Sequence, residues 1–188
     1  MAQVEAKLKE MGVAFLVPPP PAGNYVSAVR TGNLVYMAGV GPRNADGEYI
    51  LGKLGRDLTV DEGYEAARWC AINMLTNLHL EIGDLDRVVQ FVKLLGMVNS
   101  DPDFTQPPAV INGCSDLLVE AFGDKGRHAR SAVGMATLPF GMAVEVEAVI
   151  SEVDDEARRV IASGYLTVNG RTIYHLGDFS LAIVQPSE

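Results

Sequence analysis

The stretch HARSAVGMATLPFGMAVEVEAV, from His128 to Val149, predicts two strands and places the most informative charged residues of the chain on them. If its first half is a strand, Arg130 shares a face with small side chains, because residues two apart lie on the same side. These small residues are Ala132, Gly134 and Ala136. In the apolar run that follows, from Ala143 to Ile150, Glu145 and Glu147 share one face. A guanidinium and two carboxylates on paired strands would form either a small anion site or a salt bridge.

The sequence before this stretch completes an α+β pattern. Two runs, 25–29 and 34–40, are expected to form a hairpin across the turn Arg-Thr-Gly-Asn. Thr59 and Glu62 match a capping box, and apolar residues at three- and four-residue steps predict a long helix from there to Ile82. A turn and a strand occupy 83–100, and a second helix is expected at 109–122. The order ββαβαββ predicts a mixed β-sheet with two main helices packed on one face.

The two ends of the chain differ from its centre. Residues 1–13 form a short charged amphipathic stretch, which we expect to be an N-terminal helical extension, and Pro18–Pro21 force an extended segment after it. Beyond Val153 the sequence becomes polar, and 154–188 is predicted to be a C-terminal extension with a hairpin around Asn169-Gly170. The main domain is therefore predicted to span 14–153.

Composition excludes several function classes. The chain has 188 residues, 48% of them hydrophobic, so it can bury the core of one domain. Its formal net charge of −9, with no cluster of Lys and Arg, disfavours nucleic acid as a partner. Cys70 and Cys114 have neither disulfide nor metal-ligand spacing, which favours a cytoplasmic location and predicts no metal. No segment is long and apolar enough to predict a membrane span.

Arg130 is the leading functional candidate, because its planar fork can bind a carboxylate through two parallel hydrogen bonds. Glu145 and Glu147 are not expected to be both buried and both ionised unless a cation lies near them, and Arg130 is one candidate for that cation. The alternative is an exposed acidic edge. His79 and His128 are more typical of structural histidines.

Four segments together resemble the Rid (YjgF) family of enamine/imine deaminases, and the match covers Ala14 to Val153. These segments are GNYVSAV, LVYMAGVGP, VVQFVKLLGMVNSDPDFTQPPAVINGCSDLLVEAFG and HARSAVGMATLPFGMAVEVEAV. The sequence is most similar to a less characterised, endoribonuclease L-PSP-like branch. The resemblance implies a chorismate-mutase-like (YjgF) fold and a homotrimer with a barrel-like core and clefts between subunits.

The resemblance also implies roles for individual residues. Arg130 would bind the substrate carboxylate, and Glu145 would hold the attacking water. Tyr25, Gly39 and Asn112 would complete the substrate-binding site. The chain departs from well-known members at two places: Ala132 stands two residues after the arginine where they carry cysteine, and their Gly-Gln-x-Pro corner is Gly-Val-Gly-Pro here, at 39–42.

The activity implied by the resemblance is hydrolytic deamination of reactive 2-imino or enamine acids, such as 2-aminoacrylate, to 2-keto acids and ammonia, with no cofactor. The alternative is a non-catalytic trimer that binds small carboxylates or acts as a regulatory protein through the same cleft. A ribonuclease ranks last, because the acidic chain offers no basic track for phosphates.

Overall fold

The computed structural model describes residues 3–153, 159–168 and 171–182, and the chain forms two compact units, Met1–Glu152 and Val153–Glu188. The first unit has the predicted order ββαβαββ after a short N-terminal helix. Its elements are α1 (Gln3–Glu10), β1 (Ala28–Thr31), β2 (Leu34–Val40), α2 (Val60–Ile82), η1 (Leu85–Arg87), β3 (Val88–Asn99), α3 (Pro107–Phe122), η2 (Gly123–Gly126), β4 (Ala129–Met135), η3 (Pro139–Gly141) and β5 (Val144–Glu152).

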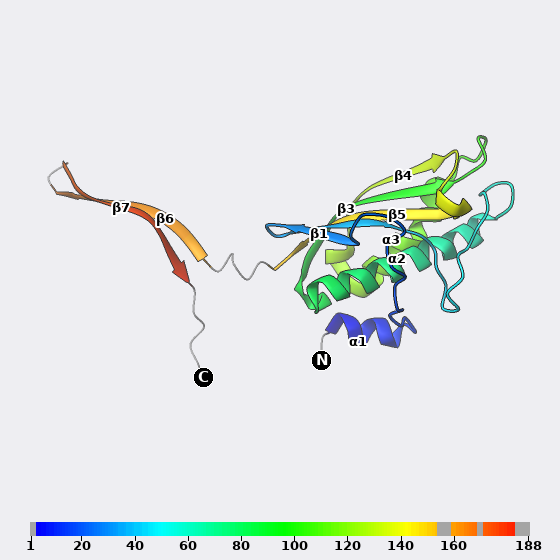
Figure 1. Cartoon of the computed structure of the whole chain (residues 1–188), viewed down its shortest axis with the longest axis horizontal. Helices are drawn as coiled ribbons and strands as arrows, with labels where there is room; N and C mark the ends of the chain where they lie inside the picture. The colour runs from blue at the N-terminus through cyan, green and yellow to red at the C-terminus, as the bar shows by residue number, and fades with distance from the viewer. Residues whose placement is uncertain (1–2, 154–158, 169–170, 183–188) are drawn as a thin grey trace. The chain divides into compact units, whose positions relative to one another are not determined.

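The five strands form one mixed sheet in the order β1-β2-β5-β3-β4. All neighbours are antiparallel except β3 and β4, which are parallel and connected through α3. Helices α2 and α3 lie against one face of the sheet (Figure 1), so the predicted layer arrangement is confirmed. One expectation was wrong: β4 and β5 do not pair, because β3 lies between them.

The first hairpin differs in detail from the prediction. β1 begins at Ala28 rather than at Tyr25, so Tyr25 lies in the loop before the strand. The turn consists of two residues, Gly32 and Asn33, and Gly32 has a φ of 56°. A two-residue hairpin turn favours positive φ at its first position, which glycine adopts without a steric penalty.

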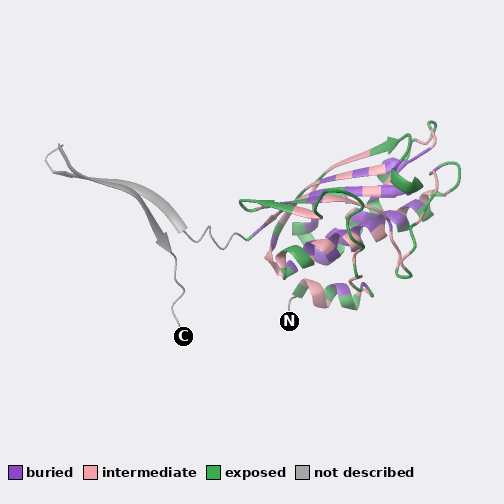
Figure 2. Ribbon diagram, viewed as in Figure 1, coloured by how far each residue is buried: buried purple, intermediate pink, exposed green. Residues whose placement is uncertain are grey.

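Helix α2 begins as the sequence predicts. The Thr59 hydroxyl accepts a hydrogen bond from the Glu62 amide at 3.3 Å, and the Glu62 carboxylate accepts one from the Thr59 amide at 2.8 Å. The central strand β5 alternates between residues that are buried against the helices and residues that are not, whereas the edge strands β1 and β4 contain no buried residue (Figure 2). In β5 the even-numbered residues face the helices, so Glu145 and Glu147 share the other face as expected.

Helices α2 and α3 cross in close contact at Gly113. A Cβ atom on Gly113 would overlap the main-chain carbonyl oxygen of Tyr64 in α2 and would lie 3.2 Å from the amide nitrogen of Arg68. The Tyr64 hydroxyl donates a hydrogen bond to the Asp116 carboxylate of α3 at 3.0 Å. The position of α3 therefore depends on the absence of a side chain at Gly113.

The sheet face opposite the helices, which we call the open face, carries exposed apolar side chains. Val29, Tyr36 and Val133 are 54%, 46% and 41% exposed. Leucine, methionine and valine side chains of β3 and β5 share this face with Lys93 and the two β5 carboxylates. Exposed apolar side chains on one face of a sheet are typical of a protein interface.

The last residue of β5 is fixed by the strands and turns around it. Glu152 is buried, and its carboxylate forms ion pairs with Arg30 of β1 and with Arg87, the latter at 3.5 Å. Its amide donates to the Asn33 carbonyl at 2.9 Å. In the second unit, β6 (Arg159–Val168) and β7 (Arg171–Ala182) pair antiparallel, and the turn residues expected at 169–170 lie outside the described residues. None of the described helices has the length and hydropathy that a membrane crossing requires.

Candidate functional site

A cleft of about 1270 Å³ runs along β2, and three of the predicted site residues line it. We call it the β2 cleft. Tyr25, Gly39 and Glu145 line it, together with Glu147 and the extended segment Pro18–Pro21. The four prolines keep this segment extended, and Tyr25 is 53% exposed beside it. The β2 cleft therefore combines an acidic floor with an apolar and aromatic wall.

The carboxylate of Glu145 lies over the backbone of Gly39. A Cβ atom on Gly39 would overlap the Glu145 Oε1 atom, so glycine is the residue that leaves room for the carboxylate. Partial burial raises the pKa of the Glu145 carboxyl, and the charge of Glu147 raises it further. A carboxyl group whose pKa is raised toward neutrality is suited to exchanging protons with a bound water.

Arg130 lies at the free edge of the sheet, on β4, and is held by α3. Its Nη1 atom donates to the Asn112 Oδ1 atom at 2.9 Å and to the Ser115 hydroxyl at 3.0 Å, and its Nη2 atom donates to the Pro108 carbonyl at 3.4 Å. Asn112 and Ser115 are one helical turn apart, so their side chains lie on the same face of α3. These contacts fix the plane of the guanidinium, as carboxylate binding requires.

His128 extends this cluster. Its Nδ1 atom lies 2.7 Å from the Gly126 carbonyl and its Nε2 atom lies 3.1 Å from the Ser115 hydroxyl. Burial lowers the pKa of His128, and the nearby charges of Arg130 and Lys93 lower it further. The neutral ring then donates to Gly126 and accepts from Ser115, which leaves the Ser115 oxygen free to accept from Arg130.

The structure does not bring Arg130 and Glu145 together within one chain. Arg130 is level with Leu94, on the helix-facing side of the sheet, whereas Glu145 is level with Met97 on the open face. β3 separates their strands, so the two residues are offset by two strand spacings, about 10 Å, across the sheet and by three residues, about 10 Å, along it, and they lie on opposite faces. Of the two alternatives, the salt bridge between Arg130 and the β5 carboxylates is absent among residues 3–153, and the two groups of one chain are too far apart to contact one small molecule together.

The small residues after Arg130 are explained in part by packing within the chain. A Cβ atom on Gly134 would lie 2.7 Å from the Ser100 hydroxyl. Ala132 is partly buried, and Ala136 lies beyond the end of β4. The absence of a side chain at Gly134 is therefore explained by its contact with Ser100 of the same chain.

Sequence reasoning missed several residues of these two regions. Ser115 was not singled out, although its position three residues after Asn112 was a usable signal. His128 was interpreted as structural without reference to Arg130. Tyr49 and Phe140, which also line the β2 cleft, were not considered. Their neighbourhood depends on contacts between distant segments, which local sequence patterns do not reveal.

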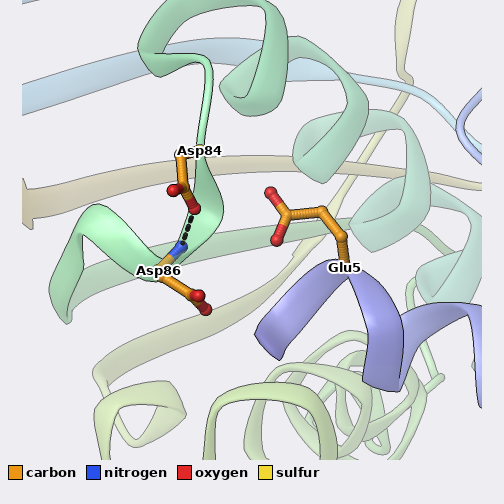
Figure 3. Close-up of side chains that lie close together, drawn as sticks. All are labelled: Glu5, Asp84 and Asp86. Atoms are coloured by element: carbon orange, nitrogen blue, oxygen red, sulfur yellow. Dashed lines mark hydrogen bonds between the residues drawn. The ribbon is translucent and has the colours of Figure 1, made fainter. Parts of the chain in front are cut away.

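Three carboxylates gather elsewhere, where the turn after α2 meets α1. Glu5, Asp84 and Asp86 place oxygen atoms within 4.8 Å of one another (Figure 3). Their oxygens accept main-chain hydrogen bonds: Asp86 accepts from the first amides of α1, Asp84 from the Asp86 amide, and Glu5 from the Leu85 amide. This arrangement fastens α1 to η1 by capping and does not need a metal ion.

Cys70 and Cys114 are both buried, and their thiols are free, so the two residues form no disulfide. Burial raises the pKa of Cys114 to about 12 and that of Cys70 well above its usual range. Both thiols therefore stay protonated at neutral pH and are unsuited to act as nucleophiles.

Comparison with known proteins gives a consistent result. Residues 6–150 match the family model described as "YjgF/chorismate_mutase-like, putative endoribonuclease". Protein TCP17 of Trypanosoma cruzi is 47% identical over 149 residues, which cover 79% of this chain and 93% of that protein.

Two solved structures are similar over the same part of the chain. Protein Atu1372 of Agrobacterium tumefaciens has a TM-score of 0.74 and 40% identity, covering 80% of this chain and 94% of its own. A Shewanella oneidensis protein, described as "a putative endoribonuclease", has a TM-score of 0.76 and 30% identity, covering 79% of this chain and 99% of its own.

Proposed function

Because this chain belongs to the YjgF/chorismate mutase-like family, we propose that it hydrolyses reactive 2-imino acids, and the enamines that tautomerise to them, to 2-keto acids and ammonia. The observation that carries the proposal is the half-buried Glu145 carboxylate above Gly39 in the β2 cleft, whose pKa is raised by burial. It provides a proton acceptor beside a space that a small acid can enter.

The proposed site is shared between two copies of the chain. Arg130 and Glu145 lie on opposite faces of one sheet, so both can reach one substrate only if Arg130 comes from a neighbouring copy. The exposed apolar side chains of the open face support association through this face. We propose a cyclic homotrimer, in which repeated contacts would form three equivalent clefts.

The proposed reaction uses these groups as follows. The guanidinium of Arg130 binds the substrate carboxylate and orients the imine carbon. Glu145 accepts a proton from a water molecule while the water oxygen forms a bond to the imine carbon. The electron pair of the C=N bond moves to nitrogen in the same step. The protonated Glu145 then returns the proton to nitrogen, which gives a carbinolamine. Glu145 next takes the proton of the carbinolamine hydroxyl and passes it to nitrogen, so that the oxygen electron pair forms C=O while the C–N bond breaks and ammonia and the 2-keto acid are released. An enamine first takes up a proton at its terminal carbon and loses one from nitrogen, which converts it to the imine.

The word endoribonuclease in the descriptions of relatives fits this chain poorly. The net charge of −9 and the two carboxylates of the β2 cleft repel a phosphate backbone. A non-catalytic trimer that binds small carboxylates uses the same Arg130 cluster and differs only in lacking turnover.

Mixed assemblies test the proposal. We expect Arg130→Ala and Glu145→Gln each to abolish ammonia release above the spontaneous rate from an imine generated by an amino-acid oxidase. Assemblies refolded from an equal mixture of the two variants should recover about one quarter of the wild-type activity, since each cleft receives both intact groups about one time in four.

Sedimentation equilibrium on each sample gives the oligomeric state and serves as the control. No turnover by the folded wild-type protein would refute the deaminase proposal. Turnover that is lost in the variants but never recovered in mixtures would refute the shared site.

A further inference from the structure

The β2 cleft continues past Glu145 toward Gly41, and no group in that part of the cleft takes part in the proposed reaction. Gly39 and Gly41 are two residues apart, so in extended backbone they lie about 7 Å apart on the same side. Over Gly39 lies the Glu145 carboxylate, whereas the Met142 sulfur lies over Gly41, with the Tyr49 ring 3.3 Å from the position of a Cβ atom there. The floor of the cleft thus changes from acidic to apolar within the length of a small amino acid.

Two distant segments form the wall of this apolar end. Gly52 donates to the Gly141 carbonyl at 3.0 Å and Ala143 donates to the Ile50 carbonyl at 3.0 Å, which ties Ile50–Gly52 to the turn before β5. Tyr49, Leu51, Phe140 and Met142 all line the cleft, and Leu51 is 52% exposed. The backbone contacts therefore gather four apolar side chains at one end of the cleft.

Phe140 has a conformation that folding does not explain. Its φ is 57°, in the left-handed region, and its side chain is 78% exposed. A non-glycine residue in this region is strained, and burial of the ring does not compensate for the strain here. Strain kept at the rim of a cleft is typical of a residue retained for a ligand contact.

We infer that Tyr49, Leu51, Phe140 and Met142 form a subsite for the side chain of the substrate, and that the preferred substrates are 2-imino acids with branched or aromatic apolar side chains rather than 2-aminoacrylate. The inference rests on the proposed function, since Glu145 sets the position of the imine carbon. The acidic end of the cleft holds the reacting water, and the apolar end holds the side chain.

Binding of 2-keto acids, the reaction products, tests the subsite without requiring turnover. Pyruvate and 4-methyl-2-oxopentanoate differ by three carbons, each worth about fourfold in affinity when fully buried. Because the cleft is open, we expect the branched acid to bind the full-length protein about tenfold more tightly in calorimetry. Equal affinities would overturn the inference.

Phe140→Gly and Tyr49→Ser sharpen the test. Glycine adopts a φ of 57° without strain, so Phe140→Gly should fold and should be at least as stable as the wild type. Each variant should reduce the tenfold preference to about threefold or less and leave the affinity for pyruvate unchanged. Leu80→Ala, which removes a 66% exposed side chain outside the cleft, is the matched control and should keep the preference.

The outcomes separate the two proposals. Preferential binding of the branched acid without turnover of any imine would refute the deaminase and keep the subsite. Equal turnover of both imines with equal binding of both keto acids would refute the subsite and keep the deaminase. If Phe140→Gly lost the binding of both keto acids, the ring would be supporting the whole cleft. That result would also overturn a subsite for the substrate side chain.

Discussion

Replacing Gly113 by alanine tests how closely α2 and α3 are packed. An added Cβ atom would overlap the Tyr64 carbonyl oxygen, which is part of the α2 backbone and cannot rotate away. Alanine gains about 1 kcal/mol in helix propensity. Overpacking against a fixed backbone costs about 3 kcal/mol, so the unfolding free energy should fall by about 2 kcal/mol.

Gly63→Ala is the matched control, because Gly63 is also a buried helical glycine but faces side chains. Its Cβ would lie 2.5 Å from the Leu54 Cδ1 atom and 3.1 Å from Val110, both of which can shift. We expect a loss of about 1 kcal/mol or less. Urea denaturation at matched protomer concentration measures both values, since association contributes to stability.

A second consequence concerns the candidate site. A displaced α3 moves Asn112 and Ser115, which hold Arg130, so Gly113→Ala should also weaken keto-acid binding. Equal stability of Gly113→Ala and Gly63→Ala would refute the reasoning, because the backbone contact would then impose no constraint.

Three further predictions concern charge and domain organisation. Glu145→Gln should raise the unfolding free energy at pH 7, because the raised pKa of Glu145 means that its ionised carboxylate destabilises the folded state. This gain should disappear as pH falls below 4.5, where the carboxyl is protonated in both the folded and the unfolded state. A loss of stability at pH 7 in denaturant titrations would contradict the prediction. The lowered pKa of His128 means that the unfolded chain binds a proton first. Stability should therefore decline as pH falls below 6.5, whereas His128→Gln should flatten that part of the pH profile. Deleting 154–188 should leave a folded unit with a cooperative thermal transition, and an insoluble product would show that the boundary is misplaced.

Local patterns predicted the elements well. The Thr59–Glu62 capping box and the apolar spacing after it predicted α2 from its first residue to its last, because both signals act within a few residues. The two-residue period likewise placed Glu145 and Glu147 on one face of β5. α3 begins at Pro107, two residues before the prediction, because proline is favoured in the first turn of a helix.

The arrangement of the site was less predictable. The pairing of β3 with both β4 and β5 is a long-range property, so the sequence did not show that Arg130 and Glu145 would lie on opposite faces. The contact of Glu145 with Gly39 also depends on the β2–β5 pairing. The resemblance named the residues, but only the sheet order shows that one chain separates them.

The anchoring of Glu152 bears on how such a chain can lengthen during evolution. Two partly exposed arginines and the Asn33 carbonyl hold the final residue of β5, whose own carboxylate is buried. The last residue of β5 is therefore anchored within its own unit, before the chain continues at Val153. Segments added by gene fusion after this point can be gained, exchanged or lost without readjusting the packing of β5, and the same position suits the attachment of a reporter domain.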